Sequence, residues 1–128
     1  MNKYLSIVVI RKNKILVRKH RLKKRTWNFI GKTLKPEETW VEVAHRFALQ
    51  NFNPWVEVKR FGGQEYEETG DVEEFWAIRL ESTTKLPWYF HLLYECEWIG
   101  KEEAKVRTRN YGPDVFHYIQ YFFGYVND

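Results

Sequence analysis

The stretch Trp27-Asn28-Phe29-Ile30-Gly31-Lys32-Thr33-Leu34-Lys35-Pro36-Glu37-Glu38-Thr39, with the segment that follows it to Phe52, decides the fold of this chain. Its first four residues form a short aromatic run typical of a strand, which enters a turn at Gly31. Thr39 followed by Glu42 has the spacing of a helix capping box. Beyond Thr39 the apolar residues recur every three or four positions, so the sequence predicts a strand, a turn and an amphipathic helix.

The rest of the chain has strand patterns on both sides of this unit. An N-terminal hairpin is expected from strands at 4–10 and 15–17. After Asn53-Pro54 ends the helix, further strands are expected at 55–61, continuing over 64–68 beyond a break at Gly62-Gly63, and then at 72–80 and 88–98. Pro113 opens a final amphipathic helix. This order predicts one α/β domain over 1–128, with a mixed sheet between helices.

The positive charge of the chain is local. The net charge is +4, from 21 Lys and Arg against 17 Asp and Glu. A single segment carries the candidate anion-binding residues Arg18, Lys19, Arg21, Lys23, Lys24 and Arg25. Without that segment the chain is slightly acidic, which favours one anion-facing surface over a generally basic protein. The alternative is a solvated loop.

Composition excludes several classes of protein. Cys96 is the only cysteine, so neither an internal disulfide nor a multi-cysteine zinc site is possible. No run approaches the roughly 18 apolar residues of a membrane span, and Met1 leads directly into a strand pattern without a signal-peptide hydrophobic region. A reducing cytoplasm is the simplest predicted location. Most of the tryptophans are expected in the core, with one or two available to stack on a base: Trp27, Trp55, Trp76, Trp88 and Trp98.

The central unit resembles the Nudix box of the Nudix hydrolase family, G-x5-E-x7-R-E-U-x-E-E-x-G-U, where U is a bulky aliphatic residue. The positions that fall into the family's frame are Trp27, Phe29, Gly31, Leu34, Pro36, Glu38, Thr39 and Arg46. Lys32 replaces the second Gly of the frame, and Glu37 replaces the Gly before the first motif Glu. The resemblance implies a Nudix-like α/β/α sandwich with a mixed sheet, a box helix and a C-terminal helix. It also implies that 18–25 lies beside the substrate cleft, where Lys32 adds a further cation.

The catalytic half of the motif departs from the family. Phe47 stands where the Glu after the motif Arg belongs, Gln50-Asn51 replace the Glu-Glu pair, and Asn53 replaces the closing Gly. A second register, in which Glu37 is the first motif Glu, does not restore the acidic cluster either. The family's reaction needs magnesium held by several carboxylates. The resemblance therefore implies the fold, while the departures argue against the family's usual reaction.

Few carboxylates remain that could hold a metal. Glu38 and Glu42 lie one helical turn apart and are weak candidates for a single magnesium ion. The alternative is that they stabilise the positive end of the helix dipole. Glu65, Glu67 and Glu68 could add carboxylates from outside the box, with Tyr66 lining the cleft. Arg46 is expected to pair with Glu42 or with loop carbonyls. No catalytic residue is assigned.

Three functions remain open. The first is a Nudix-fold protein with little or no hydrolysis that binds a nucleotide or another phosphorylated ligand, RNA, or a protein partner; no cofactor is assigned to it. The second is an active Nudix pyrophosphohydrolase with a non-standard magnesium site. The third is a small RNA-binding domain acting through 18–25, whose affinity would grow with polymer length and fall steeply with salt. No membrane partner is expected.

Overall fold

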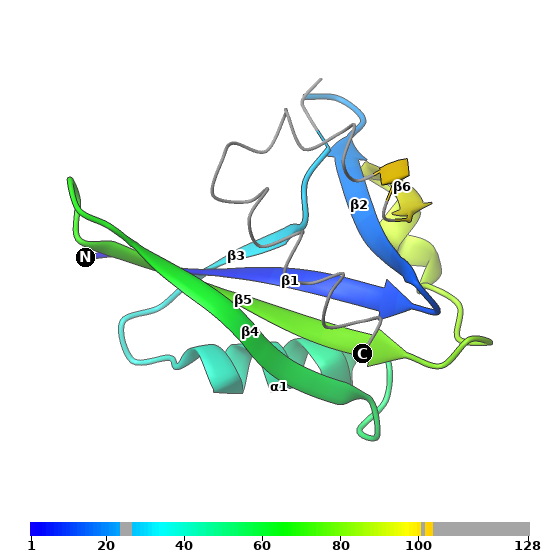
Figure 1. Ribbon diagram of the computed structural model, residues 1–128, viewed down its shortest axis with the longest axis horizontal. Coiled ribbons are helices and arrows are strands. Elements are labelled where there is room, and N and C mark those ends of the chain that lie inside the picture. Colours follow the sequence, from blue (N-terminus) through cyan, green and yellow to red (C-terminus); the bar gives the residue numbers. More distant parts are fainter. Residues whose placement is uncertain (24–26, 101, 104–128) are drawn as a thin grey trace.

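The computed structural model describes residues 1–23, 27–100, 102 and 103 (Figure 1). These residues form one mixed sheet, an α-helix and a short 3-10 helix. The elements, in chain order, are β1 (Lys3–Arg11), β2 (Lys14–His20), β3 (Ile30–Leu34), α1 (Trp40–Asn51), β4 (Glu57–Tyr66), β5 (Asp71–Leu80), η1 (Trp88–His91) and β6 (Tyr94–Ile99). Within the described part of the chain, no helix is both long and apolar enough to traverse a bilayer.

The strands are ordered β4-β5-β1-β2-β6, and β3 pairs with β1 beside this path. β1 and β5 run parallel, whereas the other pairs are antiparallel. One edge of β1 serves two partners, because its residues 3–7 pair with β3 and its residues 10–11 pair with β2. β2 therefore diverges from β1 after the hairpin and pairs with β6 instead (Figure 1). The predicted mixed sheet is confirmed.

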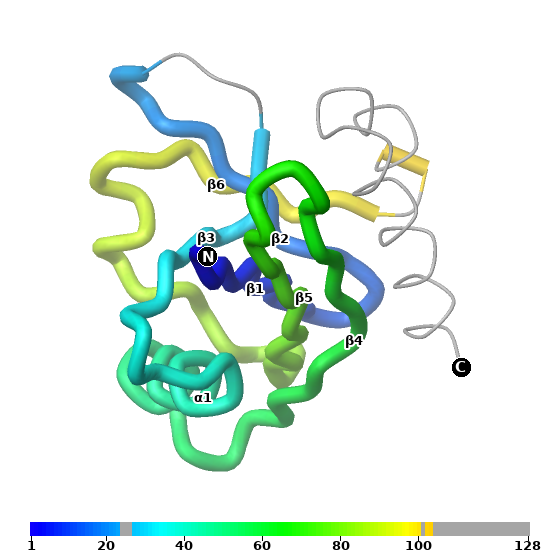
Figure 2. Tube along the Cα trace, turned by 90° about the vertical axis from the view of Figure 1, so that its left-hand side faces the viewer, coloured from blue at the N-terminus to red at the C-terminus, as the bar shows by residue number. Residues whose placement is uncertain are grey.

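β1 is the central strand because it is apolar on both faces. Leu5, Ile7 and Val9 join the core cluster that α1 covers, while Val8 and Ile10 join a second cluster on the opposite face. Strands covered on both sides read as continuous hydrophobic runs, as 7–10 do here. α1 contributes its apolar stripe to the first cluster and lies along one side of the sheet (Figure 2).

Two expected boundaries differ because hydrogen bonding to a neighbouring strand overrides local sequence signals. The expected break at Gly62-Gly63 is a bulge within β4, where the pairing register with β5 shifts between Arg60 and Gly62. At Gly63 a Cβ would lie 2.8 Å from Arg60 Nη2, the end of a flexible side chain, and 3.1 Å from Glu73 O, so a larger residue there requires these neighbours to shift. The third strand begins at Ile30 rather than at Trp27, because β1 pairs with 30–34.

The expected strand at 88–98 is divided. Residues 88–91 form η1, which buries Phe90 against the core, and only 94–99 pair with β2. Three tryptophans expected in strands lie outside them, Trp27, Trp55 and Trp88. Of these, Trp55 is 90% exposed and Trp88 is 74% exposed. The expected C-terminal helix from Pro113 lies outside the described residues.

Candidate functional site

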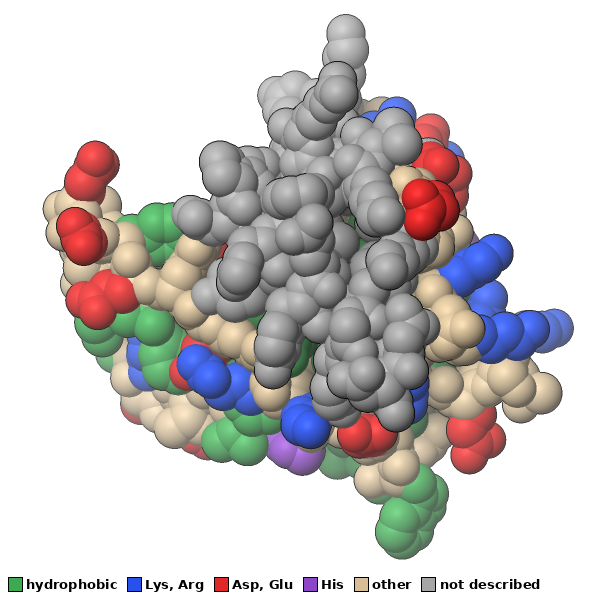
Figure 3. All heavy atoms as spheres, in the orientation of Figure 1, with side chains coloured by type: hydrophobic (Ala, Val, Ile, Leu, Met, Phe, Trp, Pro, Cys, Tyr) green, Lys and Arg blue, Asp and Glu red, His purple; other side chains and the backbone are tan. Residues whose placement is uncertain are grey.

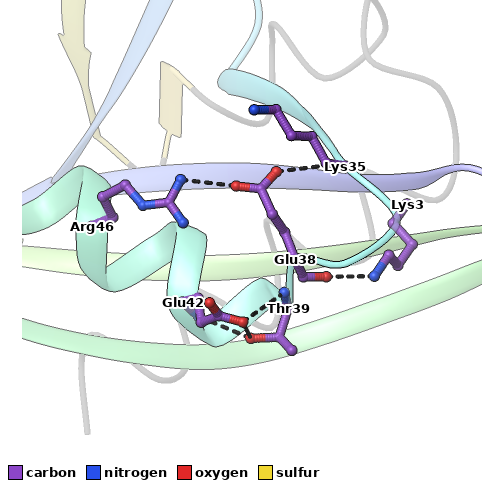
Figure 4. A network of polar contacts seen from close by, with 6 residues as sticks. All are labelled: Lys3, Lys35, Glu38, Thr39, Glu42 and Arg46. Carbon is purple, nitrogen blue, oxygen red and sulfur yellow. Dashed lines mark hydrogen bonds and ion pairs between the residues drawn. The ribbon is translucent and has the colours of Figure 1, made fainter.

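The start of α1 is held by the predicted capping box. The Glu42 N–H donates to Thr39 Oγ1 at 3.3 Å, and Glu42 Oε1 accepts from the Thr39 N–H at 3.1 Å (Figure 4). These bonds satisfy two backbone donors that a helix start otherwise leaves unpaired. The Glu42 carboxylate is therefore committed to the helix terminus.

Glu38 is committed to a different set of partners. Its Oε1 accepts from the Lys35 N–H at 2.8 Å, and its Oε2 accepts from Arg46 Nη1 at 2.8 Å (Figure 4). Its backbone carbonyl accepts from Lys3 Nζ. The expected pairing of Arg46 with Glu42 is wrong, because the capping box already turns Glu42 toward Thr39. Arg46 instead ties α1 to the loop that precedes it.

These contacts lower the pKa of Glu38, chiefly through the Lys35 N–H and next through the Arg46 guanidinium. A carboxyl whose pKa is depressed by folding stabilises the protein above its unfolded pKa, and that contribution is lost as the pH falls through the folded pKa. Wild type is therefore expected to exceed Glu38→Gln in free energy of unfolding near neutral pH, with the gap shrinking below about 4.3. Urea denaturation of both proteins across this range measures the gap. A gap that does not change with pH would contradict the assignment.

The carboxylates of the box region do not converge on a metal site. Glu38 and Glu42 face separate partners (Figure 4). Among 1–23, 27–100, 102 and 103, no group of three His, Cys, Asp or Glu side chains is placed to hold a metal ion. Glu65, Glu67 and Glu68 line a hollow that neither Glu38 nor Glu42 borders. Glu38, Glu42 and the other carboxylates of the described ranges therefore do not form the cluster of ligands that a magnesium site of this kind requires.

Structural side chains occupy the positions of two missing carboxylates. Phe47 is 8% exposed, and its ring packs against Phe52 and Phe90. Asn51 Nδ2 donates to Phe47 O at 2.8 Å, and Asn51 Oδ1 accepts from the Tyr89 hydroxyl at 2.5 Å. Asn51 therefore fastens η1 to α1. Phe47 and Asn51 thus take part in packing and in one hydrogen bond between α1 and η1.

Polar groups remain around this ring stack. Lys32 Nζ lies 5.5 Å from the centroid of the Phe47 ring. Arg46 and Gln50 are exposed on α1, four residues apart and therefore on the same side of the helix. We call this surface the box-helix face and define it by Lys32, Arg46, Gln50, Asn51 and Tyr89.

The described members of the basic segment make contacts within the fold. The Arg18 guanidinium lies 3.8 Å from the centroid of the Tyr94 ring, and burial lowers the pKa of Arg18. Lys19 Nζ lies 3.6 Å from Glu95 Oε2, and Arg21 Nε donates to His91 O at 3.2 Å. These contacts hold β2 to β6 and to η1.

The remaining residues of the basic segment are Lys23, Lys24 and Arg25. The Lys23 N–H donates to His20 Nδ1, and Lys23 is exposed. Lys24 and Arg25 lie outside the described residues. A hollow lies between β3 and the β4–β5 turn, and of the candidate cations that the structure describes only Lys32 borders it. Arg18, Lys19, Arg21 and Lys23 do not line this hollow, and the placement of 18–25 beside a substrate cleft stays a prediction.

That hollow has a volume of about 870 Å³ and is acidic. Its wall consists of Tyr4, Leu5 and Ser6 of β1, Gly31, Lys32 and Thr33 of β3, and Glu65, Tyr66, Glu67, Glu68, Thr69, Asp71 and Glu73 around the β4–β5 turn. Acidic side chains gather at this end of the molecule (Figure 3). The Glu73 carboxylate accepts from Ser6 Oγ at 2.7 Å and from the Tyr66 hydroxyl at 2.6 Å. A bare phosphate chain is disfavoured among so many carboxylates, so the box-helix face is the better candidate anion site.

No protein-family model matches the sequence, and no curated protein matches it. Solved structures do match. The E. coli dihydroneopterin triphosphate pyrophosphohydrolase is similar with a TM-score of 0.69 at 13% identity, over 94% of each chain. A C. elegans Ap4A hydrolase binary complex gives 0.67 at 15% identity, over 99% of this chain and 98% of that chain. A Nudix hydrolase from Nitrosomonas europaea gives 0.63 at 14% identity, over 96% and 88%.

At such low identities these likenesses establish the fold alone. The chain has the Nudix fold, which confirms the fold class that the resemblance implied. Sequence reasoning missed the part that Tyr89 and Phe90 play at the box-helix face, because 88–98 reads as one continuous strand. Pro87, directly before these residues, is the local signal that could have indicated the irregularity.

Proposed function

We propose that this chain binds a nucleotide or another phosphorylated small molecule at the box-helix face and hydrolyses it slowly or not at all. The observation that carries the proposal is the use made of the box positions. Phe47 and Asn51 serve packing and hydrogen bonding there, and the remaining carboxylates, Glu38 and Glu42, are held by other partners. A two-metal reaction needs several carboxylates at one point, and this arrangement does not supply them.

The fold neighbours support a small phosphorylated ligand. They include an Ap4A hydrolase and a dihydroneopterin triphosphate pyrophosphohydrolase. Of Arg18, Lys19 and Arg21, only Lys19 is paired with a carboxylate, so the choice of a small phosphorylated ligand over an RNA backbone rests on these neighbours and not on the basic segment. We place the function in a reducing cytoplasm, in keeping with a single cysteine whose pKa is raised by burial.

Paired assays of turnover and binding test the proposal. Nucleoside diphosphate-linked and dinucleoside polyphosphate compounds are assayed for magnesium-dependent hydrolysis, and calorimetry measures their binding. We expect saturable binding, with turnover at least roughly a thousandfold below that of an active Nudix hydrolase assayed in parallel. This factor corresponds to about 4 kcal/mol of activation free energy, the scale of the charge stabilisation that bound metal ions contribute.

Two results would decide against the proposal. Robust magnesium-dependent turnover that Glu38→Gln abolishes would identify an active hydrolase that uses Glu38 as a metal ligand. A lack of binding to every compound in the panel would remove the ligand-binding function itself. Glu81→Gln provides a matched control. Glu81 is an exposed carboxylate directly after β5, so its substitution removes the same charge as Glu38→Gln does.

A further inference from the structure

Lys32 occupies an unusual place in this fold. It stands at the second Gly of the family's frame, and Phe47 stands at the motif Glu after Arg46. Ile30 and Leu34, two residues to either side of Lys32 on β3, are 4% and 6% exposed and pack in the core cluster that α1 covers. Side chains alternate along a strand, so Lys32 leaves β3 on the same side. Its ammonium thereby reaches the Phe47 ring, 5.5 Å from the centroid.

This contact positions a positive charge without neutralising it. An aromatic ring attracts a cation through its quadrupole, but it carries no net charge. No ion pair joins Lys32 to a carboxylate within the described part of the chain. An ammonium has three N–H donors, and the Phe47 ring contacts only one side of the Lys32 ammonium. The Lys32 charge is therefore available to an anion.

Arg46 supplies a second set of donors on the same face. Its Nη1 donates to Glu38 Oε2 at 2.8 Å, while its side chain stays 48% exposed. A guanidinium has five N–H donors, so one carboxylate contact does not exhaust it. With Glu38 included, Lys32 and Arg46 leave about one net positive charge. That balance suits a short phosphate group better than a long one, which would extend from Lys32 toward the acidic hollow that Lys32 also borders.

We propose that the box-helix face recognises a nucleoside mono- or diphosphate without a divalent metal ion, through direct contact of the Lys32 ammonium with phosphate oxygens and with Arg46 as a second donor. The inference rests on the proposed function and adds the mode of binding and the class of ligand. In place of carboxylates that bridge to phosphate through a metal ion, the fold presents a cation carried by the protein itself. The apolar ring of Phe47 replaces the carboxylate that would otherwise compete for that cation.

Calorimetry with ADP as the probe tests this mode of binding, once with EDTA and once with excess magnesium. We expect ADP to bind at least as tightly in EDTA as in magnesium, because magnesium screens the phosphate charge that Lys32 recognises. Lys32→Met should weaken binding in EDTA at least tenfold, about 1.4 kcal/mol, and Lys32→Arg should recover most of the affinity. Lys14→Met removes the same charge from the exposed start of β2 and should change the affinity less than about twofold.

The outcomes separate the two proposals. If ADP binds only with magnesium, or if Lys32→Met binds as wild type does in EDTA, the direct ammonium contact is wrong while the ligand-binding function stands. If neither ADP nor any compound of the hydrolysis panel binds under either condition, the proposed function fails and this inference fails with it. Because Lys32 is exposed, unchanged thermal unfolding of Lys32→Met verifies that a loss of affinity is not a loss of folding.

Discussion

Phe47→Glu is expected to lower the free energy of unfolding by at least about 4 kcal/mol. Phe47 is 8% exposed and stacks with Phe52 and Phe90, and losing such a ring costs about 3–5 kcal/mol. A carboxylate in its place adds a desolvation cost, which the Lys32 ammonium offsets only in part. For a chain of this size the change corresponds to a fall in melting temperature of more than roughly 10 °C, which thermal unfolding measures.

Gln50→Glu is the matched control for this substitution. It also restores a family carboxylate, but Gln50 is exposed, so its effect should stay within about 0.5 kcal/mol. The full restoration, Phe47→Glu with Gln50→Glu and Asn51→Glu, would in addition remove the amide that binds Phe47 O and the Tyr89 hydroxyl. A triple variant that folds as stably as wild type and binds magnesium would refute this reading of the box helix.

Phe90→Ala is expected to cost about 3–4 kcal/mol of unfolding free energy. Phe90 is 9% exposed, and its ring lies 6.3 Å from that of Phe47 and 5.9 Å from that of Phe52. A buried Phe→Ala substitution loses the transfer free energy of the ring and leaves a cavity. The urea midpoint should therefore fall markedly, while the neighbouring Leu92→Ala, at a residue that is 61% exposed, should shift it little.

Equal midpoints for Phe90→Ala and wild type would show that η1 is not held to α1 by this ring stack. A displaced η1 would also change the box-helix face, because Tyr89 lies on η1 and its hydroxyl donates to Asn51 Oδ1. Nucleotide affinity measured on the same variant therefore reports whether the ring stack supports ligand binding as well as folding.

Local signals in the sequence determined several features correctly. Thr39 and Glu42 are three residues apart, and their capping box needs no contact from elsewhere in the chain. The helix stripe follows from a period of three to four residues, and the β-rich run at 4–10 indicates a strand. The departures at Phe47, Gln50 and Asn51 were identified by the resemblance to the Nudix box. Each of these features depends on neighbours within a few positions.

Contacts between distant segments could not be determined in that way. β3 brings Lys32 to Phe47 only because it pairs with β1, and because α1 packs on the face that Ile30 and Leu34 share. The 88–98 segment is divided where η1 buries Phe90 in the core cluster that α1 covers.

The candidate site also depends on contacts between segments that are far apart in the chain. The Arg46 guanidinium donates to the Glu38 carboxylate, which the loop before α1 places beside it. It does not pair with Glu42, because the Glu42 carboxylate accepts from the Thr39 N–H in the capping box. The carboxylates around the hollow come together through the β4–β5 turn and the pairing of β1 with β3 and β5. The sequence by itself determined the capping box, the helix and most of the strands, since hydrogen bonds and periodicity within a segment encode them. The resemblance to the Nudix box indicated which carboxylates are missing. Only the tertiary structure decided which cation meets which partner, because strand register and helix packing set the distances between residues far apart in the chain.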